Sequence, residues 1–437
     1  MNTITIDCGA SFLKGALFQN NQLVKRAHRQ SPVVHGNESL WEPVQLSHLL
    51  PLVENLISEL AESLEDFTLC ISNEMHGLIL ANPDASPLVD YISWQKDYGS
   101  ELIDGISSIT ILSQPEYAND IAHTGMPLRG SLPSSNMLYL KRKGMLPDTP
   151  LYYYTLGDYI IRWLSGRKPI CHPTNAAATG LYDVLNNRWN NHLIETVATE
   201  NVEFPKVGDE AIEFDYKGHH VICYPALGDQ QAALLGAGVE TDGDLSFNIG
   251  TGAQVSMLTK DTTLSNDYQL RPFFNGYYLR SIPHLPSGRA LNVYIRFIKD
   301  SLRAMGEVKS DEEIWSAVIA EEKKCSETSL QVDLSFFQTP MTDHQEGNIS
   351  NISEYGLTLG ALMHAVFQQM VVNYMWAAEK MAPIRSAIKR IVFSGGVARR
   401  IDAIREGVLA NYDENVPVIV ASDETLVGLN KYATYGR

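Results

Sequence analysis

The sequence lacks any apolar run of the roughly 18 residues that a membrane-spanning helix requires. It also lacks the marks of a secretory signal, because residues 1–7 have no basic start and alternate between apolar and polar side chains, as a strand would. We therefore expect a protein that has no membrane contact and is not exported.

Cysteine is scarce and is not arranged in sets. The five cysteines are odd in number and scattered, and no two of them form a Cys-x-x-Cys pair. Structural disulfides and zinc sites both need matched cysteines. We therefore expect free thiols and a cytoplasmic, reducing compartment.

Positive charge is also in deficit. The chain has 34 Lys and Arg against 51 Asp and Glu, which gives a formal net charge of −17 at pH 7. A nucleic-acid-binding surface needs an excess of basic side chains, so no nucleic acid is expected as a partner. A polyanionic small ligand would need local help from backbone N–H groups, a lysine or a metal ion.

The two common phosphate-binding motifs are missing: neither the Walker pattern nor a Gly-x-Gly-x-x-Gly between a strand and a helix occurs. Instead, a strand, a turn of small residues and a second strand occur twice, at residues 3–18 and 244–258. Such turns let backbone N–H groups approach phosphate oxygens, but plain β-hairpins use the same residues. The turns comprise Gly9, Ala10 and Ser11 in the first copy and Gly250, Thr251 and Gly252 in the second.

The length and this repetition predict two domains. A chain of 437 residues is too long for one small core. Glycines cluster near residues 236–243, between the two halves. We expect α/β domains at residues 1–238 and 239–437.

Two carboxylates lie where extended segments end. Asp7 leaves the first strand beside the first turn, where it could hold Mg²⁺, and Lys14 could point back toward the same site. Asp229 follows Gly228 at the expected start of a helix. There it can act as an ordinary helix cap or as a base that removes a proton from a hydroxyl.

Two further segments allow both a functional and a structural interpretation. His76 lies in a polar loop after the strand 67–71, where it could donate to a sugar hydroxyl or simply occupy a surface turn. It has no partner at metal-ligand spacing. Gly395 and Gly396 lie between a strand and a helix, where they could admit a flat ring or a ribose, or serve close packing.

Taken in order, these segments resemble the FGGY family of carbohydrate kinases. The resemblance runs nearly from end to end and implies an α/β fold with two ribonuclease H-like domains of the actin/hexokinase ATPase type and a cleft between them. The matching segments are Asp7–Lys14 for the first phosphate motif, Met75–Gly77 for the sugar pocket, Gly228–Gln231 for the catalytic base, Ile249–Gln254 for the second phosphate motif and Ser394–Gly396 for the adenosine motif.

The resemblance also implies roles for single residues, with ATP and Mg²⁺ as cofactors. Asp229 would be the catalytic base and Asp7 the metal ligand. The sugar would contact Met75, His76, Trp94, Asp97, Asp229 and Gln230. The nucleotide would contact Gly9, Ala10, Ser11, Lys14, Gly250, Thr251, Gly252, Gly395, Gly396 and Arg399.

Three of these segments depart from the family pattern. Ala10 replaces the usual threonine of the first phosphate motif, and Ser394 replaces the first glycine of the adenosine motif. The family often carries Trp-x-Asp-x-Arg in the sugar pocket, whereas here Trp94 is followed by an acid displaced by one position, Asp97, and by no arginine. The sugar preference could therefore differ from that of named members.

Within the family the likeness is to sedoheptulokinase and xylulokinase-type members. It implies transfer of the γ-phosphate of ATP to a primary hydroxyl of a ketose resembling sedoheptulose or xylulose, and it is compatible with a homodimer. The alternatives are a kinase for another polyol or sugar of the glycerol, ribulose or gluconate type, an actin-like ATPase, and a non-catalytic sugar sensor.

Overall fold

A computed structural model describes residues 2–32, 45–382, 384–422 and 424–435. The chain divides into two compact units. Unit 1 comprises Met1–Gly236, Asp261–Tyr278 and Asp423–Arg437, and unit 2 comprises Ala237–Lys260 and Leu279–Ser422. The boundary between Gly236 and Ala237 lies among the glycines expected to separate the halves, and two later segments, Asp261–Tyr278 and Asp423–Arg437, belong to unit 1.

Unit 1 is an α/β unit built around a seven-stranded sheet. Its strands are β1 (Asn2–Cys8), β2 (Phe12–Gln19), β3 (Gln22–Gln30), β4 (Asp66–Asn73), β5 (Leu78–Ala81), β6 (Pro87–Ile92), β7 (Leu102–Ile103), β8 (Ile106–Ser107), β9 (Leu151–Tyr154), β10 (Tyr182–Asp183), β11 (Arg188–Trp189), β12 (Val202–Glu203), β13 (Ile212–Tyr216), β14 (His219–Cys223), β15 (Leu227–Gly228) and β18 (Gln269–Pro272). Its α-helices are α1 (Leu46–Ala61), α2 (Ser108–Leu112), α3 (Ala118–His123), α4 (Pro133–Arg142), α5 (Leu156–Ser165), α6 (Pro173–Ala176), α7 (Asn191–Val197), α8 (Asp229–Gly236) and α14 (Glu424–Tyr435).

The large sheet of unit 1 brings the ends of three parallel strands together. Its strand order is β13-β14-β4-β1-β2-β3, and β15 also pairs with β4. β1 is antiparallel to β2 and parallel to β4, and β4 is parallel to β15. Since parallel strands run the same way, β1, β4 and β15 end at one edge of the sheet.

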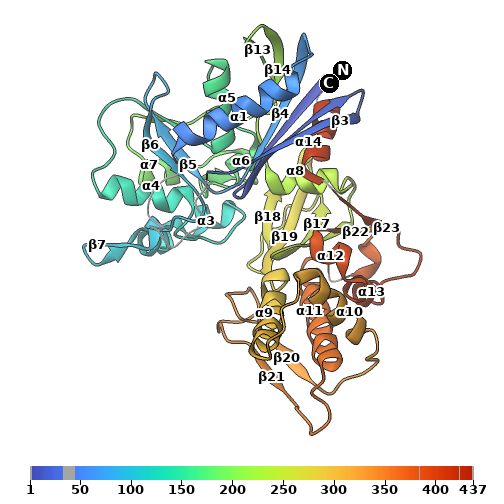
Figure 1. The fold of residues 1–437 in the computed structure, drawn as a ribbon. Coiled ribbons are helices and arrows are strands. Elements are labelled where there is room, and N and C mark those ends of the chain that lie inside the picture. Colours follow the sequence, from blue (N-terminus) through green and yellow to red (C-terminus); the bar gives the residue numbers. More distant parts are fainter. Residues whose placement is uncertain (1, 33–44, 383, 423, 436–437) are drawn as a thin grey trace. The chain divides into compact units, whose positions relative to one another are not determined.

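The two faces of β1 differ because side chains alternate along a strand. Ile4 and Ile6 are fully buried in the core that the apolar face of α1 completes. Thr5 and Asp7 point to the other face, where Leu426 of α14 packs against β2. Figure 1 shows α1 lying along the sheet and α14 beside α8. The carboxylate of Asp7 is thus on the face that carries α8.

Helices α8 and α14 approach closely at two glycines. A Cβ at Gly236 would lie 1.6 Å from the carbonyl oxygen of Glu424, and one at Gly428 would lie 1.8 Å from that of Ala232. Neither position has room for a side chain. Because α14 also packs on β1, β2 and β4, this contact fixes α8 relative to the sheet.

Unit 2 repeats the strand pattern of unit 1. β16 is antiparallel to β17 and parallel to β22, the relation that β1 has to β2 and β4, so the predicted second strand–turn–strand segment is confirmed. The elements are β16 (Asp244–Ile249), β17 (Ala253–Thr259), β19 (Tyr278–Leu285), β20 (Gln331–Asp333), β21 (Asn348–Ser350), β22 (Arg390–Ser394), β23 (Val418–Val420), α9 (Gly288–Ala304), α10 (Asp311–Glu322), α11 (Leu359–Met381), α12 (Gly396–Arg400) and α13 (Asp402–Leu409).

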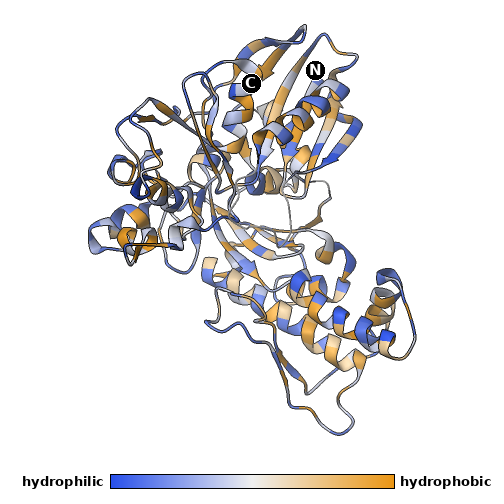
Figure 2. Cartoon of the chain, turned by 60° about the vertical axis from the view of Figure 1, so that its left-hand side comes forward, coloured by the Kyte–Doolittle hydropathy of each residue, from blue (hydrophilic) through white to orange (hydrophobic). Residues whose placement is uncertain are grey.

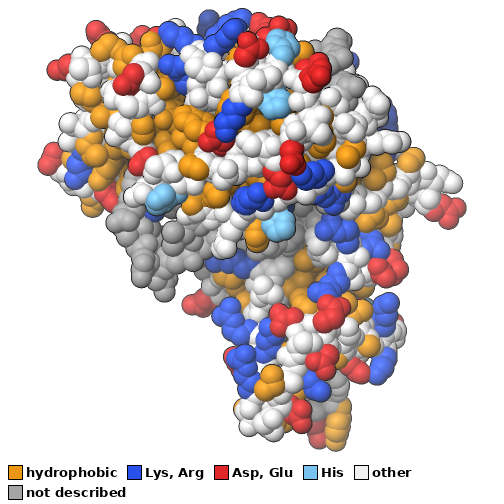
Figure 3. Space-filling view, turned by 45° about the horizontal axis from the view of Figure 1, so that its top comes forward, with side chains coloured by type: hydrophobic (Ala, Val, Ile, Leu, Met, Phe, Trp, Pro, Cys, Tyr) orange, Lys and Arg blue, Asp and Glu red, His pale blue; other side chains and the backbone are white. Residues whose placement is uncertain are grey.

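The distribution of hydrophobic and charged side chains shows which faces of the elements are buried. The helices and strands in Figure 2 alternate between hydrophobic and hydrophilic residues, as elements with one buried face do. On the face shown in Figure 3, acidic and basic side chains are interspersed. Within the described ranges, no helix combines the length and the apolar character needed to cross a bilayer.

Candidate active site

Three acidic side chains gather at the shared strand edge of unit 1. Asp7 is the penultimate residue of β1, Glu74 directly follows β4, and Asp229 follows β15 as the first residue of α8. β15 pairs with β4 at Ser72 and Asn73, immediately before Glu74. The topology therefore brings together carboxylates that are far apart in the sequence.

Asp7 is buried and has a defined hydrogen-bond partner. The hydroxyl of Ser72, its neighbour across β4, donates to Asp7 Oδ1 over 2.9 Å. Burial raises the pKa of the Asp7 carboxyl, while the Ser72 hydroxyl and the charge of Lys14 oppose the rise. Lys14 lies opposite Asp7 on β2, so the structure brings these two predicted residues together.

Asp229 has the properties expected of a proton acceptor. Its Oδ1 accepts the backbone N–H of Gln230 over 2.8 Å, inside the first turn of α8. Burial, and then the charges of Asp7 and Glu74, raise the pKa of the Asp229 carboxyl to about 7. A base whose pKa lies near the working pH exchanges protons most effectively. The helix start thus orients a carboxylate that is poised to take a proton.

Met75 lies directly against the segment that ends in Asp229. A Cβ on Gly228 would lie 2.6 Å from Met75 Sδ and 2.7 Å from Gln231 Oε1. The N–H of Gly228 donates to Thr174 Oγ1 over 3.1 Å. A side chain at this position would have to displace the flexible ends of Met75 and Gln231, which pack against the Gly228 backbone.

His76 is held in a left-handed backbone conformation, with φ of 67°. Its Nδ1 lies 2.7 Å from the carbonyl oxygen of Ala178. Since a carbonyl only accepts, Nδ1 carries the proton, which leaves Nε2 of the neutral ring as an acceptor. Arg129 Nη2 lies 3.5 Å from that Nε2. In this tautomer His76 accepts at Nε2, whereas the sequence suggested a donor.

Trp94 and Asp97, expected together in the sugar pocket, have different surroundings. The Trp94 indole N–H donates to Glu74 Oε2 over 3.1 Å, and the Tyr91 hydroxyl donates to Glu74 Oε1 over 2.7 Å. Trp94 therefore lies beside the acidic cluster. Asp97 instead accepts the backbone N–H of Ser100 over 3.2 Å and caps a short turn.

In unit 2, the second small-residue turn is held by the start of a helix. Gly250 O accepts the N–H of Gly288 over 3.1 Å, and Thr251 O accepts the N–H of Arg289 over 2.8 Å. A Cβ on Gly252 would meet nothing within 4 Å. The turn is thus fixed from behind by α9 while its tip stays open.

The glycine pair of unit 2 lies next to this turn. Gly395 has φ of 89°, and a Cβ there would lie 2.4 Å from the carbonyl oxygen of Ile249. Gly396 has open space around it, and Arg399 Nη1 donates to Ala421 O over 3.3 Å. Gly395 therefore serves close backbone packing, and Gly396 provides the open surface.

The donor set around Asp7 fits a magnesium ion whose other ligands would mostly be water molecules and phosphate oxygens. Within the described ranges, no three His, Cys, Asp or Glu side chains are grouped as a protein-only metal site. The charge of Asp7 raises the pKa of the Asp229 carboxyl. A cation bound at Asp7 would therefore relieve the repulsion between these two carboxylates. Mg²⁺ in phosphate-handling sites is commonly held by only one or two carboxylates.

Several residues of the site were not predicted. Ser72, Glu74 and Tyr91 complete the acidic cluster, and Glu74 could have been found because it follows a strand parallel to that of Asp7. Two arginines, Arg129 and Arg271, contact the predicted sugar loop. No local pattern marks them, because each meets the loop only through the fold.

Comparisons with known proteins agree on one family. A family model described as the N-terminal domain of the FGGY family of carbohydrate kinases matches residues 2–236. Glycerol kinase from Marinomonas sp. (strain MWYL1) is 21% identical over 336 residues, which are 71% of this chain and 66% of that protein. A glycerol kinase of Coxiella burnetii is 25% identical over 291 residues, 61% of this chain and 56% of that protein. The chain thus spans two thirds or less of the length of these curated relatives.

Solved structures agree on the fold. Xylulose kinase from Rhodospirillum rubrum superposes with a TM-score of 0.86 at 15% identity, covering 100% of this chain and 90% of that one. Ligand-bound xylulose kinase from Lactobacillus acidophilus gives a TM-score of 0.81 at 18% identity, covering 100% and 89%. The predicted α/β architecture with two domains of the actin/hexokinase ATPase type is confirmed.

Proposed function

This chain belongs to the FGGY family of carbohydrate kinases, and from that premise we propose that it transfers the γ-phosphate of ATP to a hydroxyl of a sugar or polyol. The observation that carries this proposal is Asp229, a carboxylate at a helix start whose pKa is raised to about 7 by burial and by the charges of Asp7 and Glu74. Phosphoryl transfer needs little covalent chemistry from a protein and depends on positioning and charge stabilisation.

Asp229 would accept the proton of the acceptor hydroxyl as that oxygen attacks phosphorus. The hydroxyl would be primary, as in ketoses of the xylulose or sedoheptulose type. Met75, His76, Trp94 and Gln230 would orient the acceptor, whereas Asp97 would act through the turn that it caps. A carboxylate of pKa near 7 can take the proton at neutral pH and release it to water afterwards.

The nucleotide phosphates would be bound by small-residue turns. Each unit has one such turn, Gly9–Ser11 in unit 1 and Gly250–Gly252 in unit 2, and within unit 2 Gly396 has open space around it. Asp7 would hold Mg²⁺, which when bound neutralises phosphate charge. Lys14, paired with Asp7 across β1 and β2, would add a positive charge on the same face of the sheet.

The compartment and the assembly are further parts of the proposal. All five cysteines are free thiols, four of them buried, which fits the reducing cytoplasm.

A homodimer is the assembly that the family resemblance suggests. Light scattering on the purified chain tests it directly.

Coupled measurement of ADP release tests the proposed reaction. The purified chain is assayed with Mg-ATP alone and with a panel of ketoses, alditols and sugar acids. Acceptor-stimulated release, with a phosphorylated product found by mass spectrometry, is expected. Release that ignores the acceptor would indicate an actin-like ATPase, and acceptor binding without release would indicate a sugar sensor.

A further inference from the structure

Arg271 is a buried arginine without a carboxylate partner. It lies on β18, and its side chain is 1% exposed, the largest fully buried side chain in the described ranges. Nη1 donates to Ala177 O over 2.9 Å and contacts Met126 Sδ at 3.4 Å. Nη2 lies 3.9 Å from Met75 Sδ. Nε donates to no atom of the described residues.

Such a charge is costly unless something compensates it. Buried charges are normally paired, because a lone ion in a protein interior loses its hydration without replacement. Burial, and then the nearby charge of Arg129, lower the pKa of the Arg271 guanidinium to about 9, so the group stays charged at neutral pH. By contrast, the partly buried Arg390 is paired with the buried Asp244.

The uncompensated charge adjoins the proposed acceptor site. Arg271 contacts Met75, and Arg129 contacts His76, the next residue of the same loop. Met75 in turn packs against Gly228, which precedes the proposed base Asp229. One side chain, that of Met75, therefore separates the Arg271 guanidinium from the backbone that carries the base.

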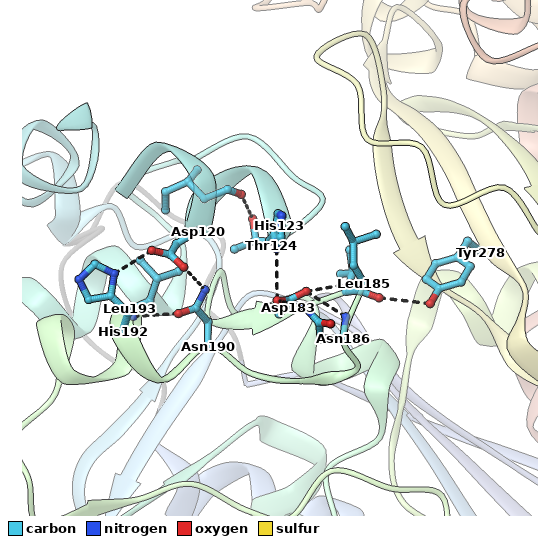
Figure 4. Close-up of polar contacts among 12 residues, drawn as sticks. Asp120, His123, Thr124, Asp183, Leu185, Asn186, Asn190, His192, Leu193 and Tyr278 are labelled. Atoms are coloured by element: carbon cyan, nitrogen blue, oxygen red, sulfur yellow. Dashed lines mark hydrogen bonds and ion pairs between the residues drawn. The ribbon is translucent and has the colours of Figure 1, made fainter. Parts of the chain in front are cut away.

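The segments that carry the two arginines are anchored by polar contacts. Figure 4 shows Asp120 of α3 accepting from Asn190 and His192, and Asp183 facing His123. Further along the same segment, Gly125 O accepts the N–H of Leu270, the residue before Arg271, over 2.8 Å. Hydrogen bonds thus tie the segments that precede Arg129 and Arg271 to the rest of unit 1.

We propose that Arg271, with Arg129 beside it, binds an anionic group of the acceptor, so that the acceptor of this kinase is a polyhydroxy carboxylate. The Nε–Nη2 edge of Arg271 makes no hydrogen bond to oxygen, and such an edge matches a planar carboxylate bidentately. Met75, an unbranched and adaptable side chain, would move from Nη2 as the ligand binds. The inference rests on the proposed function. It replaces the ketose suggested by the family resemblance with a sugar acid, which keeps a primary hydroxyl at the end away from its carboxylate.

The position of Arg271 also determines the orientation in which the acceptor would bind. Its carboxylate would be held at Arg271, away from the like charges of Asp7, Glu74 and Asp229, because negative groups repel each other. The hydroxyl presented to Asp229 would then belong to the opposite end of the molecule. The expected product carries its phosphate on the terminal carbon farthest from the carboxylate.

Calorimetry on the purified chain without ATP tests the anion site separately from catalysis. Aldonates of four to seven carbons are each compared with the alditol of the same stereochemistry at equal ionic strength, with sodium acetate as a control. We expect at least one aldonate to bind ~10-fold or more tightly than its alditol, since a charge-assisted bidentate bond is among the stronger hydrogen bonds. Alditol phosphates form a second arm. The inference would be overturned if every neutral alditol bound as tightly as its aldonate or more tightly. If only the alditol phosphates were preferred, the assignment of the anionic group as a carboxylate would be wrong.

Variants identify the residue responsible. Arg271→Gln is expected to abolish the preference for the acid over its alditol, and Arg271→Lys, which keeps the charge but not the planar edge, to reduce it. Arg142, which also donates to two backbone carbonyls of unit 1, provides the matched control Arg142→Gln, which should keep the preference. If Arg271→Gln does not fold, the role of Arg271 is judged from Arg271→Lys together with the wild type's preference for the aldonate over its alditol. If an acid binds but no acceptor is phosphorylated, the proposed kinase activity is refuted and the anion site stands. If only neutral acceptors are phosphorylated, the kinase activity stands and the anion site is refuted.

Discussion

Asp229 and Asp7 are coupled across the end of the unit 1 sheet: burial and then the charge of Asp7 raise the pKa of the Asp229 carboxyl to about 7. The coupling arises from topology, because β1 and β15 both lie parallel to β4 and end at the same edge. A carboxylate that begins a helix would ordinarily be an unremarkable cap. Here burial and its acidic neighbours raise its pKa toward the value that the proposed proton acceptor needs.

Asp229→Asn is expected to lower the acceptor-dependent turnover by ~100-fold or more, the range for loss of a general base. The amide can still accept the Gln230 N–H, which the carboxylate now accepts, so the helix start should persist. Steady-state kinetics with the best acceptor measure the effect. Asp215→Asn, at an almost fully exposed acid of the same unit, is the control, and near-normal turnover of Asp229→Asn would refute the assigned role.

The same variant should be more stable than the wild type at alkaline pH. Because the folded-state pKa of Asp229 lies near 7, above its ordinary value of 3.8, the folded state binds more protons than the unfolded state between these values. The free energy of unfolding therefore loses a contribution as pH rises from 4 to 7. Asparagine removes this loss, so thermal melts at pH 8 should show a higher Tm for the variant and at pH 4 a smaller difference.

Glu74→Gln should shift the pH dependence of the reaction. After burial, the charges of Asp7 and Glu74 both raise the pKa of the Asp229 carboxyl, and Glu74 contributes less than Asp7. Removing that charge lowers the pKa of the base, so the acidic limb of the kcat/KM profile should move to lower pH. Profiles of the wild type and of Glu62→Gln, an exposed acid of the same unit, should coincide. A limb that stays in place would show that Asp229 is not the titrating group.

Much of this site follows from the sequence, because local patterns identify where strands end. The alternation in residues 3–7 and the small residues after them predicted β1, its hairpin and the exit position of Asp7. The apolar helix after Asp229 predicted α8. These features depend on neighbours in the chain, which is the information that periodicity holds.

The remainder depends on contacts between distant segments. Arg271 meets Met75 and Ala177, and the segment 261–278 returns to unit 1, although nothing in its local composition signals this. Asp97 shows the opposite case. Its side chain accepts a backbone N–H three residues on, a local competition that short polar side chains commonly win. Its spacing from Trp94 in the sequence therefore does not by itself fix what it contacts.

Gly250→Val should weaken nucleotide binding more than acceptor binding. A Cβ at Gly250 would meet only Gly252 O, at the ordinary distance of 3.8 Å, so the protein itself can accommodate the first carbon of a side chain there. The branched methyl groups would instead occupy the surface proposed for phosphate oxygens. Calorimetry with ATP and with the acceptor separates the two affinities, and unchanged ATP affinity would count against this turn as a phosphate site.

Gly428→Ala tests whether the packing of α14 supports the catalytic residue. The added methyl would lie 1.8 Å from the carbonyl oxygen of Ala232 in α8, so the two helices must separate, at a cost of about 1–3 kcal/mol for overpacking. Gly144→Ala, at a loop glycine with nothing within 4 Å but a positive φ of 67°, controls for the purely conformational cost of replacing glycine. Since α8 begins at Asp229, we expect Gly428→Ala to lower both Tm and kcat, whereas Gly144→Ala should lower Tm alone. A Gly428→Ala variant with lowered Tm but unchanged kcat at a temperature where it is folded would show that Asp229 is positioned by its own strand and helix start, without help from α14.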